Sequence, residues 1–312
     1  MKKIYSKHIV SSLLAMFFFA GCDDAGFLKE DPETFYTIDN VFSTSEQVDQ
    51  VVTTCYQRVR NIYCPYDNSS ELNVWSYSMG NGTDIFDVPT IRFSYRFNDY
   101  SIINSENAVF KDTYAAFYYL VNSANTALYA ADREDIVWNS EEEKEYIVAQ
   151  ARFFRAFAYR NLGELFGGVP LVTERITTPR YDYTRASRME TYQFAIDEME
   201  AILNDLPVTT ADAGRLVRAV AQHNLCQLYM DKGVLLESEG GDAATAYNKA
   251  VSYANDVIDS GTYSLMTERF GARKDENPEF YYASSVADQT PDHTYTSVSY
   301  THLRAHETCA DL

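Results

Sequence analysis

Cysteine, histidine and glycine are all scarce in this chain. It has five Cys, five His and thirteen Gly among 312 residues, and before residue 298 it contains no Cys-x-x-Cys pair and no closely spaced pair of histidines. Structural zinc sites and redox-active dithiols need such spacings. The glycines at 167 and 168 follow a helical pattern, so they end a helix and do not cradle a phosphate group. We therefore predict that the chain holds no metal and no cofactor.

Basic residues are also few. The chain has 26 Lys and Arg against 45 Asp and Glu, which gives a formal net charge of -19. Such a chain repels the phosphate backbone, so we expect no nucleic-acid partner. The many carboxylates do not indicate catalysis, because glycoside hydrolysis needs two carboxyls set a fixed distance apart across a cleft. The acidic run at 141–143 fits the start of a helix, where negative charge complements the dipole. We predict that the protein is not an enzyme.

Long apolar runs are absent except near the N-terminus. A basic start is followed by an apolar stretch at 9–19, then by Ala20-Gly21 and Cys22. This arrangement is typical of a secretory signal and is too short for a membrane span. A Cys directly after Ala-Gly resembles a bacterial lipobox, in which the thiol is acylated before cleavage. We therefore predict a signal peptide at 1–21, lipid attachment at Cys22, membrane association through that lipid, and a tether at 22–42.

Three cysteines remain when Cys22 and Cys309 are set aside. Cys55 and Cys64 are close enough in sequence to form a disulfide in an oxidising compartment, and buried free thiols are the alternative. Cys226 has no partner nearby in the sequence. The pattern leaves both states of Cys55 and Cys64 open.

The chain beyond residue 42 has the apolar periodicity of helices, and strand-like alternation is confined to 85–103. Capping boxes are expected at Ser43 with Glu46, at Ser140 with Glu143 and at Ser187 with Glu190. Glycines at 167, 233 and 261 and prolines at 170 and 207 mark helix ends. The fold class predicted is all-α, with helices at 44–62, 107–131, 141–166, 189–203, 217–230 and 243–260.

Two helix pairs share one design. Residues 155–166 recur as 218–229, with Arg, Ala, Ala, Asn, Leu and Leu in the same register. The first pair resembles the tetratricopeptide repeat, which has an aromatic, Leu-Gly and a second aromatic in its first helix and a small residue at a fixed place in its second. The connections depart from that repeat, with insertions of 20 and 12 residues between the paired helices. The pattern predicts a tetratricopeptide-like helical-repeat platform with long inter-helix loops, which crowd one face of a solenoid.

The run AQARFFRAFAYRNLGELFGGVPL at 149–171 resembles the hallmark of SusD/RagB-like proteins, the nutrient-binding outer-membrane lipoproteins of polysaccharide-utilisation systems. Further matches follow in the expected order, among them Asn125 in the second helix and Gly214-Arg215 before the fifth. The resemblance implies a SusD-like helical domain at 43–297 that is incomplete at its C-terminus. It also implies a lipid-anchored protein at the outer membrane that faces the cell exterior.

The same resemblance implies a function in nutrient uptake. Family members dock on a SusC-like TonB-dependent outer-membrane transporter and hold a glycan, or in some members a peptide, between themselves and its barrel. We therefore expect a non-enzymatic carbohydrate-binding lipoprotein that captures oligosaccharide. A peptide-capturing member of the family and a tetratricopeptide-type scaffold for protein interaction are the alternatives.

The candidate ligand-binding residues lie in the long loop at 71–100. An indole face can stack on the apolar face of a sugar while amide and carboxylate groups bond its hydroxyls. Packing of Trp75 beneath the loop is the alternative interpretation. The residues expected to contact ligand are Asn73, Trp75, Tyr77 and Asp84, with Asn81 and Asn98 nearby.

The last fifteen residues, 298–312, share no periodicity with the rest of the chain. They resemble the translation of a sequencing adaptor at the end of a broken gene model. We therefore expect this tail not to be native and not to belong to the fold.

Overall fold

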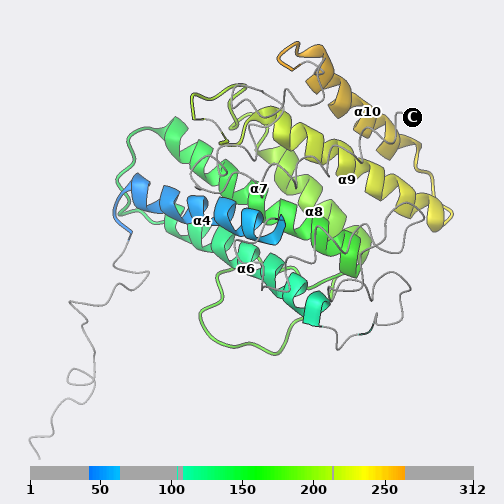
Figure 1. Ribbon diagram of the computed structural model, residues 1–312, viewed down its shortest axis with the longest axis horizontal. Helices are drawn as coiled ribbons and strands as arrows, with labels where there is room; N and C mark the ends of the chain where they lie inside the picture. The colour runs from blue at the N-terminus through cyan, green and yellow to red at the C-terminus, as the bar shows by residue number, and fades with distance from the viewer. Residues whose placement is uncertain (1–41, 64–103, 105–107, 213, 264–312) are drawn as a thin grey trace, which may run out of the picture. The chain divides into compact units, whose positions relative to one another are not determined.

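The computed structural model describes residues 42–63, 104, 108–212 and 214–263 (Figure 1). The predicted signal peptide, Cys22 and the 298–312 tail lie outside the described residues. Within these ranges six helices and no strand are present, so the all-α prediction is confirmed. They are α4 (Ser45–Tyr63), α6 (Ala108–Ala131), α7 (Glu141–Phe166), α8 (Arg188–Ala201), α9 (Arg218–Ser238) and α10 (Ala244–Asp259) (Figure 1).

Local capping explains where two of the helices begin. The hydroxyl of Ser140 accepts a hydrogen bond from the Glu143 backbone N–H at 3.1 Å, and α7 begins and ends at the predicted residues. Ser187 and Glu190 form the complete predicted capping box before α8. At α7 the Glu143 carboxylate accepts from the Asn139 backbone N–H at 3.0 Å, so the second half of the box predicted at Ser140 is not formed. Both caps satisfy backbone donors that a helix start would leave unpaired.

The predicted capping box of Ser43 with Glu46 is wrong by one residue. The helix begins at Ser45, and the side-chain oxygen of Gln47 accepts hydrogen bonds from the backbone N–H groups of Thr44 at 3.2 Å and Ser43 at 2.7 Å. An isolated parallel bridge between Thr44 and Val137 holds residue 44 in an extended conformation, so the helix starts after it. Thr44 and Gln47 obey the same spacing rule as the predicted pair.

The expected end of the fifth helix near Gly233 is also wrong, because α9 continues to Ser238. A Cβ atom built on Gly233 would lie 2.3 Å from the Tyr247 ring, so glycine stands there for close helix packing. The chain turns instead at Gly240, which has a φ of 75°. Gly163 plays the same part in the first pair, where a Cβ would lie 2.8 Å from Tyr192.

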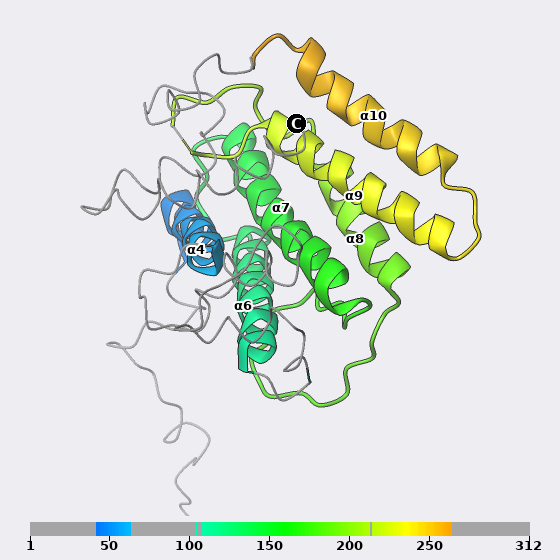
Figure 2. The same cartoon turned by 45° about the vertical axis from the view of Figure 1, so that its right-hand side comes forward.

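The helices form antiparallel neighbours that lie side by side in both ribbon views (Figures 1 and 2). In the α7–α8 pair, Gly163 near the end of α7 meets Tyr192 near the start of α8, and Arg152 meets Glu198. In the α9–α10 pair, Gly233 meets Tyr247, and the rings of Tyr229 and Tyr253 stack at 5.9 Å. The pairing of α7 with α8 and of α9 with α10 agrees with the predicted repeat.

Equivalent asparagines in the two repeat copies make the same hydrogen bond. Asn161 donates to the Phe157 carbonyl at 2.8 Å, and Asn224 donates to the Val220 carbonyl at 2.9 Å. Both side chains are buried, and bonding back one helical turn gives a buried amide a partner. The glycine that a tyrosine of the next helix contacts lies at a different position in the two copies. In α9 it is Gly233, two helical turns beyond the position that corresponds to Gly163 in α7. The second pair therefore packs in a shifted register.

The core is centred on α7, which packs against α4, α6, α8 and α9. Phe153, Phe154 and Tyr159 are fully buried, and Tyr56 of α4 meets the Phe154 ring edge-to-face at 4.6 Å. A helix with neighbours on most sides is apolar around most of its circumference, which suits this central position. Cys55 is a free thiol in this core, where burial raises its pKa to about 12. Cys64 lies outside the described residues.

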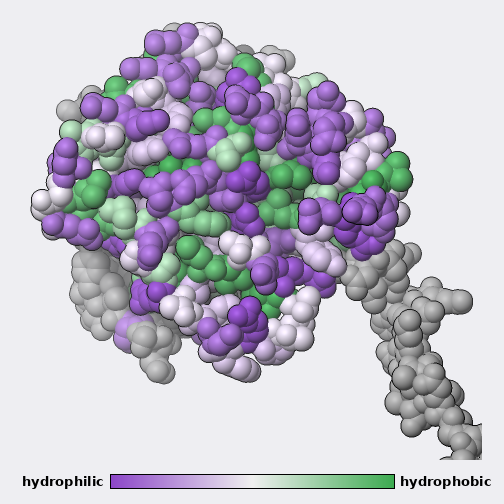
Figure 3. Space-filling view, turned by 180° about the vertical axis from the view of Figure 1, so that it is seen from behind, coloured by the Kyte–Doolittle hydropathy of each residue, from purple (hydrophilic) through white to green (hydrophobic). Residues whose placement is uncertain are grey.

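The face of the described part that lies opposite to Figure 1 is largely polar. On the face opposite to Figure 1, hydrophilic side chains predominate and apolar ones lie between them in small groups (Figure 3). Among the helices of the described ranges, none is both long enough and apolar enough to span a bilayer.

Candidate functional site

The ligand-binding residues predicted from the sequence, Asn73, Trp75, Tyr77 and Asp84, lie outside the described residues. Of the two long connections predicted within the repeats, only the first is long in the structure. The second prediction is wrong, because α9 runs to Ser238 and α10 begins at Ala244, so the extra residues lengthen the helix. The α7–α8 loop (residues 167–187) joins the helices of the first pair and carries two exposed aromatic rings, Tyr181 and Tyr183. Its geometry divides into a closed base, a segment fixed along α6 and an exposed tip.

The two ends of the α7–α8 loop are held together at its base. The Ala186 backbone N–H donates to the Val169 carbonyl at 3.1 Å, and a Cβ on Gly168 would lie 1.9 Å from the Ala186 oxygen, so only glycine fits. The guanidinium of Arg185 donates to the carbonyls of Gly168 and Phe166. Arg188 donates to two further carbonyls near the end of α7, at 3.0 and 3.1 Å. These arginines satisfy acceptors that the helix end leaves unpaired.

The first part of the loop is fixed along α6 by side chains of that helix. The Tyr118 hydroxyl donates to the Pro170 carbonyl at 2.7 Å, and the Asn125 amide donates to the carbonyls of Val172 and Glu174, both at 3.0 Å. The Asn122 side-chain oxygen accepts from the Ile176 N–H at 3.2 Å. Because helix side chains supply these partners, the segment can leave regular secondary structure and still satisfy its backbone.

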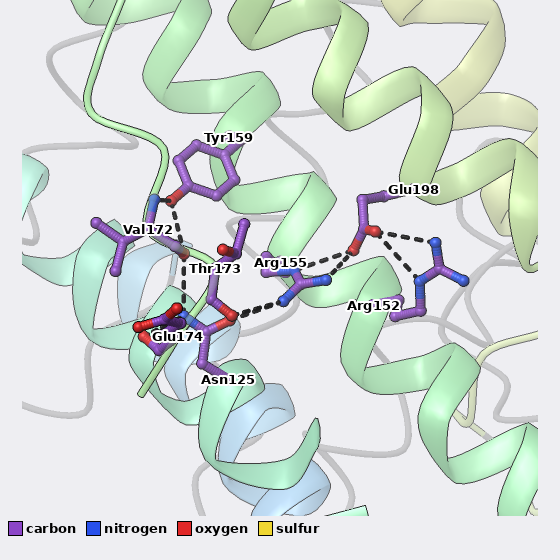
Figure 4. Close-up of polar contacts among 8 residues, drawn as sticks. All are labelled: Asn125, Arg152, Arg155, Tyr159, Val172, Thr173, Glu174 and Glu198. Carbon is purple, nitrogen blue, oxygen red and sulfur yellow. Dashed lines mark hydrogen bonds and ion pairs between the residues drawn. The ribbon is translucent and has the colours of Figure 1, made fainter. Parts of the chain in front are cut away.

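Beneath this segment lies a buried ionic cluster of Arg152, Arg155 and Glu198 (Figure 4). One carboxylate oxygen of Glu198 accepts from Arg155 Nε at 2.9 Å and Nη2 at 2.5 Å, and the other accepts from Arg152 Nη2 at 2.9 Å. The remaining Arg155 nitrogen, Nη1, donates to the Asn125 side-chain oxygen at 2.9 Å and to the Thr173 carbonyl at 3.3 Å. Arg155 and Glu198 are each 8% exposed, so the charges are largely desolvated.

Tyr159 completes the attachment of the loop. Its hydroxyl accepts from the Val172 N–H at 2.5 Å and donates to the Val172 carbonyl at 3.0 Å, which satisfies both backbone groups of one loop residue (Figure 4). Burial raises the pKa of Tyr159 well above its usual range, so the hydroxyl stays protonated and can donate. The cluster, Asn125 and Tyr159 together tie the loop to α6, α7 and α8.

The tip of the loop is exposed and aromatic. Tyr181 is 95% exposed, and Tyr183 lies two residues further along with the Arg180 guanidinium 5.4 Å from its ring centroid. Arg180 also pairs with Asp182 at 3.1 Å, and this hydrogen bond lowers the pKa of the Asp182 carboxyl. Exposed rings beside charged donors and acceptors offer an apolar face together with polar partners, the combination that a sugar ring requires.

The arrangement supports binding and gives no support to acid–base chemistry. Glu198 is engaged by two arginines, and Asp182 is paired with Arg180 on the surface. Within the ranges that the structure describes, no group of three or more His, Cys, Asp or Glu residues could hold a metal ion.

The sequence indicated Asn125 only through the family resemblance and Arg155 only through the internal repeat, and it did not single out Glu198. A polar residue on an apolar helix face is a signal that a buried partner exists, since an unpaired buried charge is costly. The partner of Arg155 could not be named from sequence because Glu198 lies on another helix, 43 residues away.

Comparisons with known proteins are consistent with this architecture. The SusD-like family model described as "Starch-binding associating with outer membrane" matches residues 27–229. A SusD-like protein of Bacteroides ovatus is 24% identical over 266 residues, which cover 84% of this chain and 46% of that protein. The chain thus spans less than half the length of this relative.

Solved structures show the same fold at low sequence identity. A SusD homologue from Bacteroides thetaiotaomicron matches with a TM-score of 0.62 and 18% identity, over 74% of this chain and 44% of that one. A structure solved with xylogluco-oligosaccharide matches with a TM-score of 0.58 and 21% identity, over 71% of this chain and 42% of that one.

Proposed function

The chain belongs to the SusD-like family, and on that premise we propose that it captures oligosaccharide for import through a SusC-like TonB-dependent transporter. The observation that carries this proposal is the family-model match over residues 27–229, because its description names both starch binding and the outer membrane. The related structure solved with xylogluco-oligosaccharide supports a glycan as ligand. We expect the protein to bind glycan without cleaving it, because the family is described as starch-binding.

The anchoring of the protein is part of the proposal. Residues 1–21 direct secretion, Cys22 carries the lipid, residues 22–42 tether the protein, and 43–297 form the SusD-like domain. The 298–312 tail makes no contribution. The protein then lies at the outer membrane and faces the cell exterior, where its net negative charge favours a soluble body on a lipid anchor.

The ligand surface combines two segments. Asn73, Trp75, Tyr77 and Asp84 supply contacts from the loop between α4 and α6, and Tyr181 and Tyr183 supply rings from the α7–α8 loop. The exposure of Tyr181 supports its part in this surface, because a ring that packs on nothing loses no intramolecular contact when it stacks on a sugar. Because the chain spans less than half the length of its Bacteroides ovatus relative, we expect the chain alone to bind weakly.

Isothermal titration with malto-oligosaccharides and xylogluco-oligosaccharides tests the proposal. We expect a form of the protein as long as its relatives to bind one of them without releasing reducing sugar. Trp75→Ala and Tyr181→Ala should each weaken binding by about 1–3 kcal/mol, or roughly 5- to 150-fold. Tyr119→Ala, at an exposed tyrosine of α6 outside both loops, is the matched control and should leave affinity unchanged.

Two results would contradict the proposal. Release of reducing sugar by the purified protein would show an enzyme. Binding of peptides with no affinity for either glycan would favour the peptide-capturing alternative. If Trp75→Ala lowers the melting temperature and leaves affinity unchanged in the folded fraction, Trp75 belongs to the core and the glycan contact falls to the α7–α8 loop.

A further inference from the structure

Helix α10 carries two apolar stripes, and only one of them is buried. Ala246 and Ala250 pack against α9, as does the half-buried ring of Tyr253. Val251 and Ile258, seven residues apart and therefore on one side of the helix, are 57% and 69% exposed. A helix that packs mainly against one neighbour, as α10 packs on α9, needs only one apolar stripe.

Helix α9 extends the exposed stripe. Met230 and Val234 are 51% and 60% exposed, and each directly follows a residue that contacts α10, Tyr229 or Gly233. The four side chains of Met230, Val234, Val251 and Ile258 form what we call the outer apolar face.

The outer apolar face points away from α8. Lys232 of α9 donates to Gln193 of α8 at 2.7 Å, and Tyr253 of α10 donates to Glu200 of α8 at 2.7 Å. These contacts define the α8 side of the α9–α10 pair. Helical periodicity places Val251 and Ile258 on the flank of α10 opposite to Tyr253, and places Met230 and Val234 on the flank of α9 opposite to Lys232.

The position of α10 makes this exposure informative. Both ribbon views place α10 at the edge of the described helices, beside α9 (Figures 1 and 2). In a stacked helical repeat, interior pairs bury both faces, whereas a terminal pair needs a polar outer face for solubility. The α9–α10 pair carries exposed apolar side chains on its outer face, as an interior pair would, and this pattern favours cover by a further element.

We propose that residues 264–297 of this chain cover the outer apolar face. The described chain ends at Tyr263, four residues after α10, and the positive φ of 65° at Gly261 turns it at the end of the helix beside Ile258. A segment tethered this closely covers the face with little loss of loop entropy. Its sequence supplies apolar groups to match, namely Leu265, Met266, Phe270, Phe280, Tyr281 and Tyr282.

Thermal melting of matched variants tests the proposal. Val251→Asp and Ser252→Asp place the same charge on adjacent middle positions of α10, one on the outer apolar face and one outside it, and Ser252 is exposed. If residues 264–297 cover Val251, Val251→Asp should lower the melting temperature by about 5 °C or more, because it buries an unpaired charge. Ser252→Asp should change it by no more than about 2 °C.

A milder pair keeps the test decisive if Val251→Asp prevents folding. Val251→Thr preserves shape and β-branching, and it should lower the melting temperature by about 3 °C, whereas Ser252→Thr should not. Limited proteolysis provides a second readout, since Val251→Thr should accelerate cleavage within 264–297 and leave cleavage elsewhere unchanged.

Two outcomes would overturn the proposal. If the Val251 variants melt and are cleaved like their Ser252 controls, no part of this chain covers the face. If light scattering shows a dimer that Val251→Asp dissociates, the face is covered by a second copy of the chain.

Discussion

Replacement of Glu198 by Gln is the sharpest test of the cluster beneath the α7–α8 loop. The substitution keeps the size of the side chain and removes its charge, which leaves Arg155 without its anion. Arg155 is 8% exposed and donates two hydrogen bonds to Glu198, so water cannot replace the lost partner fully. A buried pair that loses one member is destabilised because the other charge stays desolvated.

The expected magnitude follows from that desolvation. Removing one member of a buried ion pair costs about 3–5 kcal/mol. For a domain of this size, about 1 kcal/mol shifts the melting temperature by about 2–4 °C, so Glu198→Gln should lower it by about 6–20 °C. Urea unfolding should show the same loss in the free energy of unfolding, with a similar slope.

The loop itself provides a second readout and a control. Arg155 donates to the Thr173 carbonyl and to Asn125, so its displacement should also loosen the loop and speed proteolysis within 167–187. Asp182→Asn removes a carboxylate from an exposed pair on the same loop and should leave the melting temperature unchanged. A loss below about 1 kcal/mol for Glu198→Gln would refute the assignment of Arg155 and Glu198 as a mutually dependent buried pair.

The other predictions concern packing, titration and anchoring. Gly233→Ala should destabilise the protein by about 1–3 kcal/mol, since the added Cβ meets the Tyr247 ring, and Tyr247→Leu should recover much of that loss in a double-mutant cycle measured by urea unfolding. Burial raises the pKa of Asp231 above its unfolded value, so its contribution to stability falls as the pH rises through the interval between the two values. Asp231→Asn should remove this decrease of stability with pH, which is measured as the melting temperature at several values between about pH 4 and pH 8. An unchanged dependence of the melting temperature on pH would contradict the assignment. Cys22→Ala should release the protein from the membrane fraction, and a variant that still sediments with outer membrane would end the lipoprotein prediction.

The sequence predicted those parts of the fold that depend on local rules. The ends of α7 follow from Ser140 and the glycines at 167 and 168, and the start of α8 follows from Ser187 with Glu190. Apolar periodicity and capping act over a few residues, so they can be read from a single chain. The repeated Asn161 and Asn224 are of the same kind, because each bonds one turn back within its own helix.

The features that the sequence missed depend on contacts between elements. Gly233 looks like a helix end by composition, and only the ring of Tyr247 from the next helix explains why it stands within α9. The start of α4 is set by the bridge between Thr44 and Val137, far apart in the chain. The choice of Glu198 as partner for Arg155 depends on how α8 packs on α7. Each is a tertiary effect that overrides or completes a local signal.

The α7–α8 loop has a fixed first segment and an exposed tip. From Pro170 to Ile176 its backbone is bound by side chains of α6 and α7, whereas Tyr181 at the tip is almost fully exposed. Binding residues on a loop gain precision from the rigid elements that hold the loop. Substitutions at the base should therefore change stability and binding together, whereas substitutions at the tip should change binding alone. A buried ion pair is costly as a source of stability, and this cluster lies directly under the fixed segment and bonds the Thr173 carbonyl. We therefore expect the cluster to act mainly by holding that segment in position.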